Sequence, residues 1–567
     1  MVLLAVGLEA GAIAWVHAER TLYYWDQIGY WGKAIEFSQA LHADPVAAWK
    51  TLARSVSREE LNLLPAAPVG LWMTVAGESR AAFIAALAGL YLFPAIVLLA
   101  AVVREWSDAS WPAITAGTAV AALLAVPALG TVLKGYVGAG GLLLALPALY
   151  LAGRRPLPDW RPWEASVIGV ACALVFLFRR WWGFWALALA LTVAAELVLL
   201  LVDRNGRNLP AIRRAVGRAG LAALGGGVVL VLLAWPRLLA IVRPGYGAGF
   251  SAYRHGTAPF HAVGETLRFW GALPLLAVAA GVVLWLRHGD RRAALVLAVM
   301  TAAPVGLLFL LQDPDAHHWL VVVPGGMLLI AVSLTRRIDA TGRRAGPVLA
   351  ALALLLTVSF SASVFAPPSV HVPGVLRALF PVGRYRPAVR HDLDEVARLL
   401  AELDARQRTA PGPISVLASS GTLCDDVLRW ANRSRGWRFL SPGRVVPAAH
   451  VDRRDGFPVM LLVSRYVIVT VPALIHLRPE DQRVVLIPRA AILERRNIGR
   501  AFSRLPVRFS LDGGVEAFLY ERTRPIKGPE VAELVREFGR YYSVESGFFD
   551  RLALLTESHP PATGSAP

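Results

Sequence analysis

A single carboxylate, Asp26, lies inside the aromatic stretch Tyr23-Tyr24-Trp25-Asp26-Gln27-Ile28-Gly29-Tyr30-Trp31, which follows the first apolar run of the chain. If residues 26–36 are helical, Asp26 and Tyr30 are four positions apart and lie on one face of the helix. The spacing then gives an acid beside a hydroxyl-bearing ring. Asp26 is therefore the candidate catalytic residue and Tyr30 a candidate substrate contact. A helix N-cap or a solvated loop acid is the alternative interpretation of Asp26.

Lys134 is a second candidate, because it stands alone between two apolar runs in Gly130–Tyr136. The topology derived below puts it on the outer side of the membrane, against the usual distribution of positive charge. Binding of a lipid phosphate would explain a lysine there. Snorkelling of its ammonium group to lipid headgroups explains it equally well.

The segment 242–268 combines cationic and aromatic residues with glycines, a composition that suits an anionic, amphiphilic ligand. An ordinary interfacial loop would have a similar composition, so both interpretations stay open. The candidate substrate contacts in this segment are Arg243, Tyr253, Arg254 and His255.

A short turn, Gln312-Asp313-Pro314-Asp315-Ala316-His317-His318, carries two acids and two imidazoles. Asp-x-Asp spacing can hold a divalent ion between a sugar donor and the protein. Adjacent histidines point to different faces of a helix, so a zinc site formed by this turn alone is not expected. Capping of the following helix by Asp315 is the simpler interpretation. We expect His317 to contact substrate, and we expect no required cofactor and no metal ligands.

The composition defines the class of protein that positions these groups. The chain has 567 residues, of which 56% are hydrophobic and 17% charged, and its mean hydropathy is +0.51. Such values are typical of a polytopic helical membrane protein rather than a soluble one. The formal net charge of +18 comes largely from arginines between apolar runs. Positive loops on the cytoplasmic side explain that charge, so nucleic-acid binding is not expected.

About eleven apolar runs have lengths that suit membrane-spanning helices. Basic residues concentrate in alternate loops, which predicts that those loops are cytoplasmic. Arg179-Arg180 is the exception, because this count places the pair in an outer turn. The expected spans lie at 1–16, 81–103, 112–130, 134–152, 164–178, 183–202, 219–240, 270–286, 293–311, 318–335 and 346–365.

Three domains follow from these patterns. Residues 1–365 form the transmembrane domain, with a large outer loop at 17–80. Residues 366–556 form an extracytoplasmic α/β domain, and 557–567 form a disordered tail. In the α/β domain we expect helices at 392–407, 424–432 and 529–542 and strands at 414–418, 459–471 and 483–488. Asp512-Gly513-Gly514 indicates a hairpin between two further strands at 507–511 and 515–520.

The pattern of residues and spans resembles a known family. An aromatic Asp26-x-x-x-Tyr30 segment follows the first span, an Asn62-x-x-Pro65 break comes later in the same loop, and about eleven spans precede an outer α/β domain. The chain resembles the GT-C glycosyltransferases of the family 39 and RgtA/B/C/D-like type, relatives of protein O-mannosyltransferases and lipid A aminoarabinose transferases. The resemblance covers about residues 15–365.

The resemblance implies that Asp26 is the catalytic carboxylate of this family and that Lys134 lies where family members carry basic residues near the lipid phosphate. The family commonly has Asp-Glu where this chain has Asp26-Gln27, which puts any role of a second carboxylate in doubt. Such enzymes move a sugar from a polyprenyl-phosphate carrier to an acceptor hydroxyl outside the cytoplasm. Because the leaving phosphate is a weak base, cations and one carboxylate base are enough for an inverting displacement.

We therefore expect an inverting hexosyl- or pentosyltransferase, multi-pass in the bacterial inner (plasma) membrane, with its C-terminal domain periplasmic or extracellular. Its partners would be the polyprenyl-phosphate-linked sugar, a cell-envelope acceptor (glycan, lipid or protein) and membrane lipids. One alternative is a transporter or flippase of a lipid-linked or anionic substrate, which would place charges at mid-membrane. Another is a non-catalytic envelope assembly subunit, which the departure at Gln27 leaves open.

Overall fold

The computed structural model describes residues 2–202, 209–242, 250–254, 259–288, 290–367, 369–372, 385–543 and 546–552. The chain forms two compact units, and each is built from three separate stretches. The helical unit comprises Met1–Glu19, Gly29–Arg243 and Arg254–Ala388. The sheet unit comprises Arg20–Ile28, Pro244–Tyr253 and Val389–Pro567, so the aromatic stretch around Asp26 is divided between the two. The predicted tail at 557–567 lies outside the described residues.

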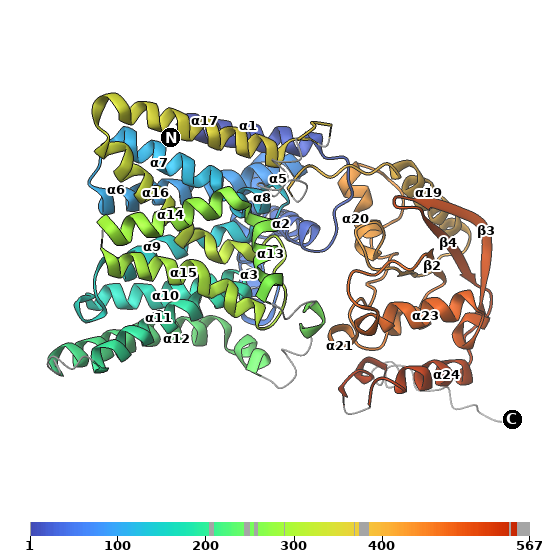
Figure 1. Cartoon of the computed structure of the whole chain (residues 1–567). Helices are drawn as coiled ribbons and strands as arrows, with labels where there is room; N and C mark the ends of the chain where they lie inside the picture. Colours follow the sequence, from blue (N-terminus) through green and yellow to red (C-terminus); the bar gives the residue numbers. More distant parts are fainter. Residues whose placement is uncertain are drawn as a thin grey trace. The chain divides into compact units, whose positions relative to one another are not determined.

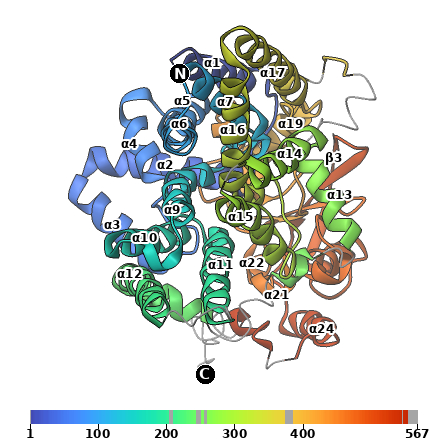
Figure 2. The ribbon, with the colours of Figure 1, turned by 60° about the vertical axis from the view of Figure 1, so that its left-hand side comes forward.

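The helical unit is a bundle of apolar helices that run side by side, as Figures 1 and 2 show from two directions. Among the described residues, seven helices are long and apolar enough to cross a membrane, and two bent pairs raise the count to nine. One pair is α7 (Trp111–Leu124) with α8 (Val126–Leu133), bent by 61°. The seven are Arg80–Ser107, Val137–Arg154, Arg180–Val202, Leu209–Ala240, Arg291–Phe309, His318–Ala340 and Gly342–Phe365; the second pair is His261–Trp270 with Ala272–Arg287.

The two remaining expected spans coincide with shorter apolar helices, α1 (Val2–Ala18) and α10 (Pro162–Phe178). All eleven expected segments are thus apolar helices, which confirms a polytopic α-helical membrane protein. The bend between α7 and α8 falls in a single predicted span. It follows Ala125 and precedes Pro127, whose ring favours the first turn of a new helix over the interior of a continuing one.

Small residues bring the membrane helices into close contact. A Cβ added at Gly117 on α7 would overlap Thr335 on α16 (Val323–Ala340). A Cβ at Gly169 on α10 would likewise overlap the backbone carbonyl of Ala222 on α12 (Leu209–Val242). Close backbone approach of this kind is the usual means of association for helices in lipid, where the hydrophobic effect does not drive them together.

The polar stretch after the first helix folds into short helices that are anchored on the bundle. They are α2 (Asp26–Ala43), α3 (Pro45–Arg58), capped by Asp44, and α4 (Ala67–Ala76). The break between α3 and α4 is fixed by Asn62, which is buried and donates from Nδ2 to the Leu177 carbonyl oxygen over 2.8 Å. Arg180 forms an ion pair with Glu60 of the same break. The basic pair that was the exception in the predicted topology therefore has an acidic partner in this stretch.

The sheet unit contains a four-stranded sheet in the order β1-β2-β4-β3. β1 (Ile414–Leu417) is parallel to β2 (Tyr466–Val471), and β4 (Val515–Arg522) is antiparallel to both β2 and β3 (Phe502–Leu511). Gly513 and Gly514 join β3 to β4 with φ angles of +77° and +72°, which confirms the predicted hairpin.

Alternate residues of β2 face two hydrophobic cores. Tyr466 and Ile468 pack with residues of α19 (Leu393–Thr409) and α20 (Asp425–Arg435). Val467 and Val469 pack with α23 (Arg483–Leu493) and α24 (Gly528–Gly539). The unit is therefore an α/β domain with one buried cluster on each face of its sheet.

Two predicted strands differ in the structure. The segment 483–488 is helical and belongs to α23, and residues 459–463 form the short helix α22 (Val459–Val463) ahead of β2. A short apolar run such as Val484-Val485-Leu486-Ile487 fits a buried strand and a buried helix equally well, so periodicity alone cannot distinguish them.

Candidate active site

Asp26 is the first residue of α2, and the short segment that carries it belongs to the sheet unit. Arg20 forms a parallel bridge with Val389, and the Arg390 amide donates to the Arg20 carbonyl oxygen over 2.8 Å. Leu22 is fully buried in the core with α19 and α20. The segment Arg20–Ile28 is therefore an integral part of the sheet unit rather than a free loop.

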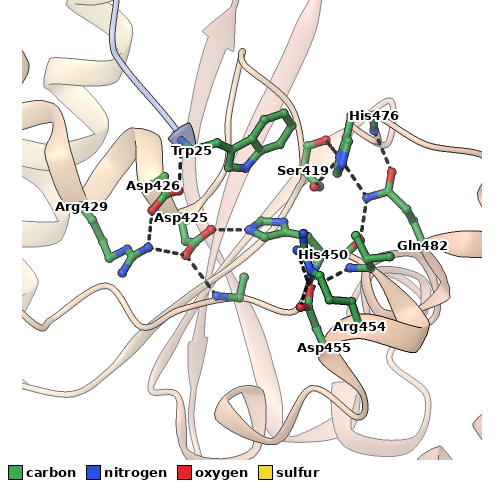
Figure 3. A network of polar contacts seen from close by, with 12 residues as sticks. Trp25, Ser419, Asp425, Asp426, Arg429, His450, Arg454, Asp455, His476 and Gln482 are labelled. Atoms are coloured by element: carbon green, nitrogen blue, oxygen red, sulfur yellow. Dashed lines mark hydrogen bonds and ion pairs between the residues drawn. The ribbon is translucent and has the colours of Figure 1, made fainter. Parts of the chain in front are cut away.

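The residue before Asp26 is held by a network of polar and aromatic contacts (Figure 3). The Trp25 amide donates to Asp426 Oδ2 over 3.2 Å. The Trp25 ring centroid lies 4.5 Å from that of His476 and 6.4 Å from that of His450. Burial and the neighbouring charge of Asp425 raise the pKa of Asp426, whereas burial lowers the pKa of His476 to about 4. His476 is accordingly neutral at pH 7.

Tyr253, one of the predicted substrate contacts, lies in the same unit. Its ring centroid is 6.2 Å from that of His476, and its hydroxyl accepts a hydrogen bond of 2.8 Å from Arg454 Nη1. Burial lowers the pKa of Arg454, but a hydrogen bond to Asp455 and the charges of Tyr253 and Asp26 raise it overall. The sheet unit thus brings Asp26 and Tyr253 to one guanidinium group. Sequence reasoning missed Arg454, because Asp452-Arg453-Arg454-Asp455 looks like any solvated charge run.

Tyr30 follows Asp26 by one helical turn but belongs to the helical unit. It is buried, and its hydroxyl accepts a hydrogen bond from Arg179 Nη1. The Arg179 guanidinium carbon lies 4.8 Å from the Tyr30 ring centroid. The predicted helix over 26–36 is present, and the role of Tyr30 in substrate binding stays a prediction.

Lys134 follows the last residue of α8 and is partly buried. Burial lowers its pKa, against the opposing charges of Asp315 and Glu19. Its ammonium group lies 5.7 Å from the Tyr385 ring centroid. Within the described part of the chain it has neither a hydrogen bond nor an ion pair within 4.0 Å. A weakly solvated cation without a close counter-ion is suited to binding an anionic group.

A second cation, Arg80, lies against the backbone at Lys134. Its Nη2 donates to the Lys134 carbonyl oxygen over 2.7 Å, and its guanidinium packs against Gly135. Arg80 is 7% exposed and lies 5.5 Å from the ring centroids of both Trp31 and Phe83. Its position at the start of a predicted span gave no reason to select it from the sequence.

The helix that ends at Lys134 also lines an apolar cavity of about 270 Å³. Leu129, Val132 and Leu133 of α8 contribute to its wall. Further lining residues come from α1 and α17 (Gly342–Phe365), among them Gly11 and Phe365. The cavity lies wholly within the helical unit and has the lining expected for a hydrocarbon chain.

The predicted turn at 312–318 forms pairwise contacts. His317 is buried and stacks on Tyr136, with ring centroids 4.7 Å apart. His261 Nε2 lies 3.2 Å from Asp313 Oδ2, and His317 Nδ1 lies 3.9 Å from Asp315 Oδ2. Across the residues that the structure describes, no group of three or more His, Cys, Asp or Glu side chains could hold a metal ion. The role of His317 as a substrate contact stays a prediction.

The remaining predicted contacts are less informative. Arg254 is exposed. Arg243 and His255 lie outside the described residues, so the structure does not test whether the segment 242–268 acts as one ligand-binding loop.

Comparison with known proteins gives a likeness in structure only. No family model matches the chain, and no curated protein does. Among solved structures, the chain is similar to ArnT from Cupriavidus metallidurans bound to undecaprenyl phosphate, with 16% identity, a TM-score of 0.49, and coverage of 91% of this chain and 97% of that one. It is similar to the apo state of the same protein, with 15% identity, a TM-score of 0.49, and coverage of 94% and 98%. At this level of similarity the function has to be inferred from the residues of this chain.

Proposed function

We propose that this protein is an inverting membrane glycosyltransferase that moves a sugar from a polyprenyl-phosphate carrier to a cell-envelope acceptor. The observation that carries the proposal is Lys134, a partly buried ammonium group that has no counter-ion within 4.0 Å among the described residues and lies at the end of a helix that lines an apolar cavity. A cation beside an apolar wall is the complement of a lipid phosphate, which is anionic at one end and hydrocarbon at the other. The residue pattern of the aromatic stretch supports the same class of enzyme.

In the proposed reaction Asp26 acts as the general base. It takes the proton of the acceptor hydroxyl as that oxygen attacks the anomeric carbon of the donor sugar. The bond between the anomeric carbon and the phosphate oxygen breaks, and its electron pair leaves with the lipid phosphate. Arg454 of the same unit is close enough to Asp26 for the two opposite charges to attract one another, so a cation lies near the proposed base.

Lys134 and Arg80 are proposed to hold the donor phosphate and to stabilise the charge that it gains on leaving. A phosphate that leaves as a weak base needs such cations but no general acid. A single carboxylate then suffices, and Gln27 in place of a second acid is compatible with the chemistry. The proposal needs no metal, and we place the protein in a bacterial plasma membrane with residues 366–556 on the extracytoplasmic side, in accord with the basic alternate loops.

The contacts of Glu196, one of the acids within the spans, do not favour the transporter hypothesis. Glu196 of α11 (Gly183–Val202) forms an ion pair with Arg292, in the first turn of α15 (Arg291–Phe309). It also accepts a hydrogen bond of 3.2 Å from the Leu157 amide. This acid therefore has a structural partner near a helix end, whereas a translocation pathway would place such groups at mid-membrane.

The test is transfer from a labelled polyprenyl-phosphate sugar by the purified protein in lipid nanodiscs, with a membrane extract as the source of acceptor. Asp26→Asn should lower kcat by about 10²–10⁴-fold, the usual contribution of a general base, and leave donor binding unchanged. Lys134→Met should raise KM for the donor by about 10–100-fold, since a hydrogen bond to a charged group contributes about 1.5–3 kcal/mol. Full activity of Asp26→Asn would refute the role of the base.

Lys50→Met is the matched control for Lys134→Met, because Lys50 is an exposed lysine of α3 in the same unit. Its kinetics should equal those of the unmodified protein. Equal losses in the two lysine variants would mean that the general positive charge of the unit matters rather than a phosphate site at Lys134.

A further inference from the structure

Trp25 has an unusual backbone for a bulky residue. Its φ angle is +48°, in the left-handed region that a residue with a large side chain rarely adopts. Such a conformation is energetically unfavourable and persists only where the surrounding structure enforces it. The residue that follows is Asp26, so the conformation at Trp25 sets the direction in which Asp26 enters α2.

Two side chains from the sheet unit enforce this conformation directly. Asp426 accepts the Trp25 amide hydrogen bond, at a position 401 residues away in sequence. His476 packs against the indole with ring centroids 4.5 Å apart. Figure 3 shows the indole directed toward the side of the network that holds the two histidines. The amide and the ring of Trp25 are thus fixed by different segments of the chain.

Hydrogen bonds connect the residues around Asp426 with those around His476. Asp425, beside Asp426, lies 2.6 Å from His450 Nε2 and accepts from the Ala448 amide over 3.1 Å. Gln482 is fully buried; its Nε2 donates to the His450 carbonyl oxygen over 2.7 Å, and its Oε1 accepts from the His476 amide over 2.7 Å. His476 Nδ1 lies 2.9 Å from the buried hydroxyl of Ser419. The contacts to Trp25 therefore rest on one connected and mostly buried network.

We infer that this network, comprising Asp425, Asp426, His450, His476 and Gln482, is a clamp by which the sheet unit positions Asp26. In this inference, which rests on the proposed role of Asp26 as base, Asp426 and His476 are positioning residues that touch Trp25 and not the substrate. The sheet unit is then part of the catalytic machinery rather than an appended domain. An enzyme whose base is misplaced by about 1 Å loses up to about 10²-fold in rate without losing substrate affinity.

The experiment compares Asp426→Ala with Asp426→Asn in the full-length protein. The amide oxygen of asparagine can still accept the Trp25 hydrogen bond, whereas alanine cannot. Asp426→Ala should lower kcat by about 10–100-fold with KM for the donor within about twofold, and Asp426→Asn should restore most of the loss. Asp404→Ala is the control, because Asp404 is a surface acid of α19 in the same unit whose ion-pair partner Arg408 is 77% exposed; it should leave the kinetics unchanged.

Amide hydrogen exchange of Arg20–Ile28 gives a readout that does not depend on activity. Asp426→Ala should speed exchange in this segment at least about tenfold, while exchange in the distant strand β3 stays as it is. Unchanged exchange in the segment would overturn the clamp even if no acceptor were found. So would equal kinetic losses in Asp426→Ala and Asp426→Asn, since they would exclude the hydrogen bond to Trp25 as the cause.

The outcomes separate the two proposals. If Asp26→Asn is inactive while Asp426→Ala has full kcat, Asp26 is the base and the clamp is wrong. If Asp26→Asn is fully active while Asp426→Ala releases the segment, the clamp exists and the proposed catalytic role of Asp26 is wrong.

Discussion

Replacing Asp425 by alanine should destabilise the sheet unit around α20. Asp425 is 2% exposed and has three partners: His450 Nε2 at 2.6 Å, the Ala448 amide at 3.1 Å and Arg429 at 3.3 Å. The variant leaves the Ala448 amide without its acceptor. It also removes the partner of His450 Nε2, in an imidazole whose Nδ1 has no hydrogen bond within the described residues. Breaking a buried pair by removing one member costs about 3–5 kcal/mol. We expect the lower value, about 3 kcal/mol, because the Arg429 side chain is 32% exposed and can turn to solvent.

The assay is amide hydrogen exchange of α20 in the full-length protein. A loss of about 3 kcal/mol speeds exchange through local opening by roughly 150-fold, since 1.36 kcal/mol corresponds to a factor of ten. Asp404→Ala should change exchange by no more than about fivefold, because exposed ion pairs contribute about 0–1 kcal/mol. An Asp425→Ala protein that exchanges as slowly as the unmodified one would refute the view that this pair stabilises the network.

The pair of Asp425 and His450 also determines how the stability of the sheet unit depends on pH. Burial raises the pKa of Asp425, but the hydrogen bond and charge of His450 lower it by more. The pKa of this carboxyl group is therefore below its usual range. The stability from ionised Asp425 is therefore complete above the unfolded pKa of about 3.9 and is lost as the pH falls through the folded value. The difference in stability between the variant and the unmodified protein should accordingly shrink as the pH falls through the folded pKa of Asp425.

Two further predictions concern the apolar cavity and the C-terminal helix. Gly11→Leu, at a position where an added Cβ meets no atom within 4 Å, should fill part of the cavity and raise KM for the lipid donor about 3–10-fold. Gly217→Leu, at an equally open glycine of α12, should leave KM unchanged. Equal KM values in the two variants would exclude the cavity as the lipid site. Hydrogen bonds from Arg524 lower the pKa of Glu530 to about 2, so its contribution to stability is present above pH 4.3 or so and is lost toward pH 2. The increase in amide hydrogen exchange of α24 on acidification should therefore be smaller in Glu530→Gln than in the unmodified protein. An identical increase in both proteins would show that Glu530 is not the group responsible.

The membrane helices were predictable because their signal is local. Long apolar runs form spanning helices whatever their neighbours, and each of the eleven expected segments is an apolar helix. The hairpin at Asp512–Gly514 was predictable for the same reason, since glycine adopts the two positive φ angles of its turn at little cost. The strand predicted at 483–488 was wrong, because this apolar run lacks the length or flanking signals that would decide between helix and strand.

The partners of the candidate site were not predictable, because they depend on contacts across the chain. Arg80 meets the Lys134 backbone from 54 residues away, and Asp426 meets the Trp25 amide from 401 residues away. Arg454 stands in a short run of charged residues, Asp452–Asp455, of a kind that is common on any protein surface. Composition and spacing identify Asp26 and Lys134 as unusual, but only the folded chain shows which groups surround each of them.

The helix face that carries Asp26 and Tyr30 is controlled by two independent sets of contacts. Asp26 directly follows Trp25, which the sheet unit holds through Asp426 and His476. Tyr30, one turn later, is held by Arg179 within the helical unit. A change in the clamp therefore acts on Asp26 through a single peptide bond, whereas Tyr30 keeps its own anchor. The aromatic stretch that looks in sequence like one compact site is divided between two folded units, and the residue before its one acid is held by side chains from the C-terminal half of the chain.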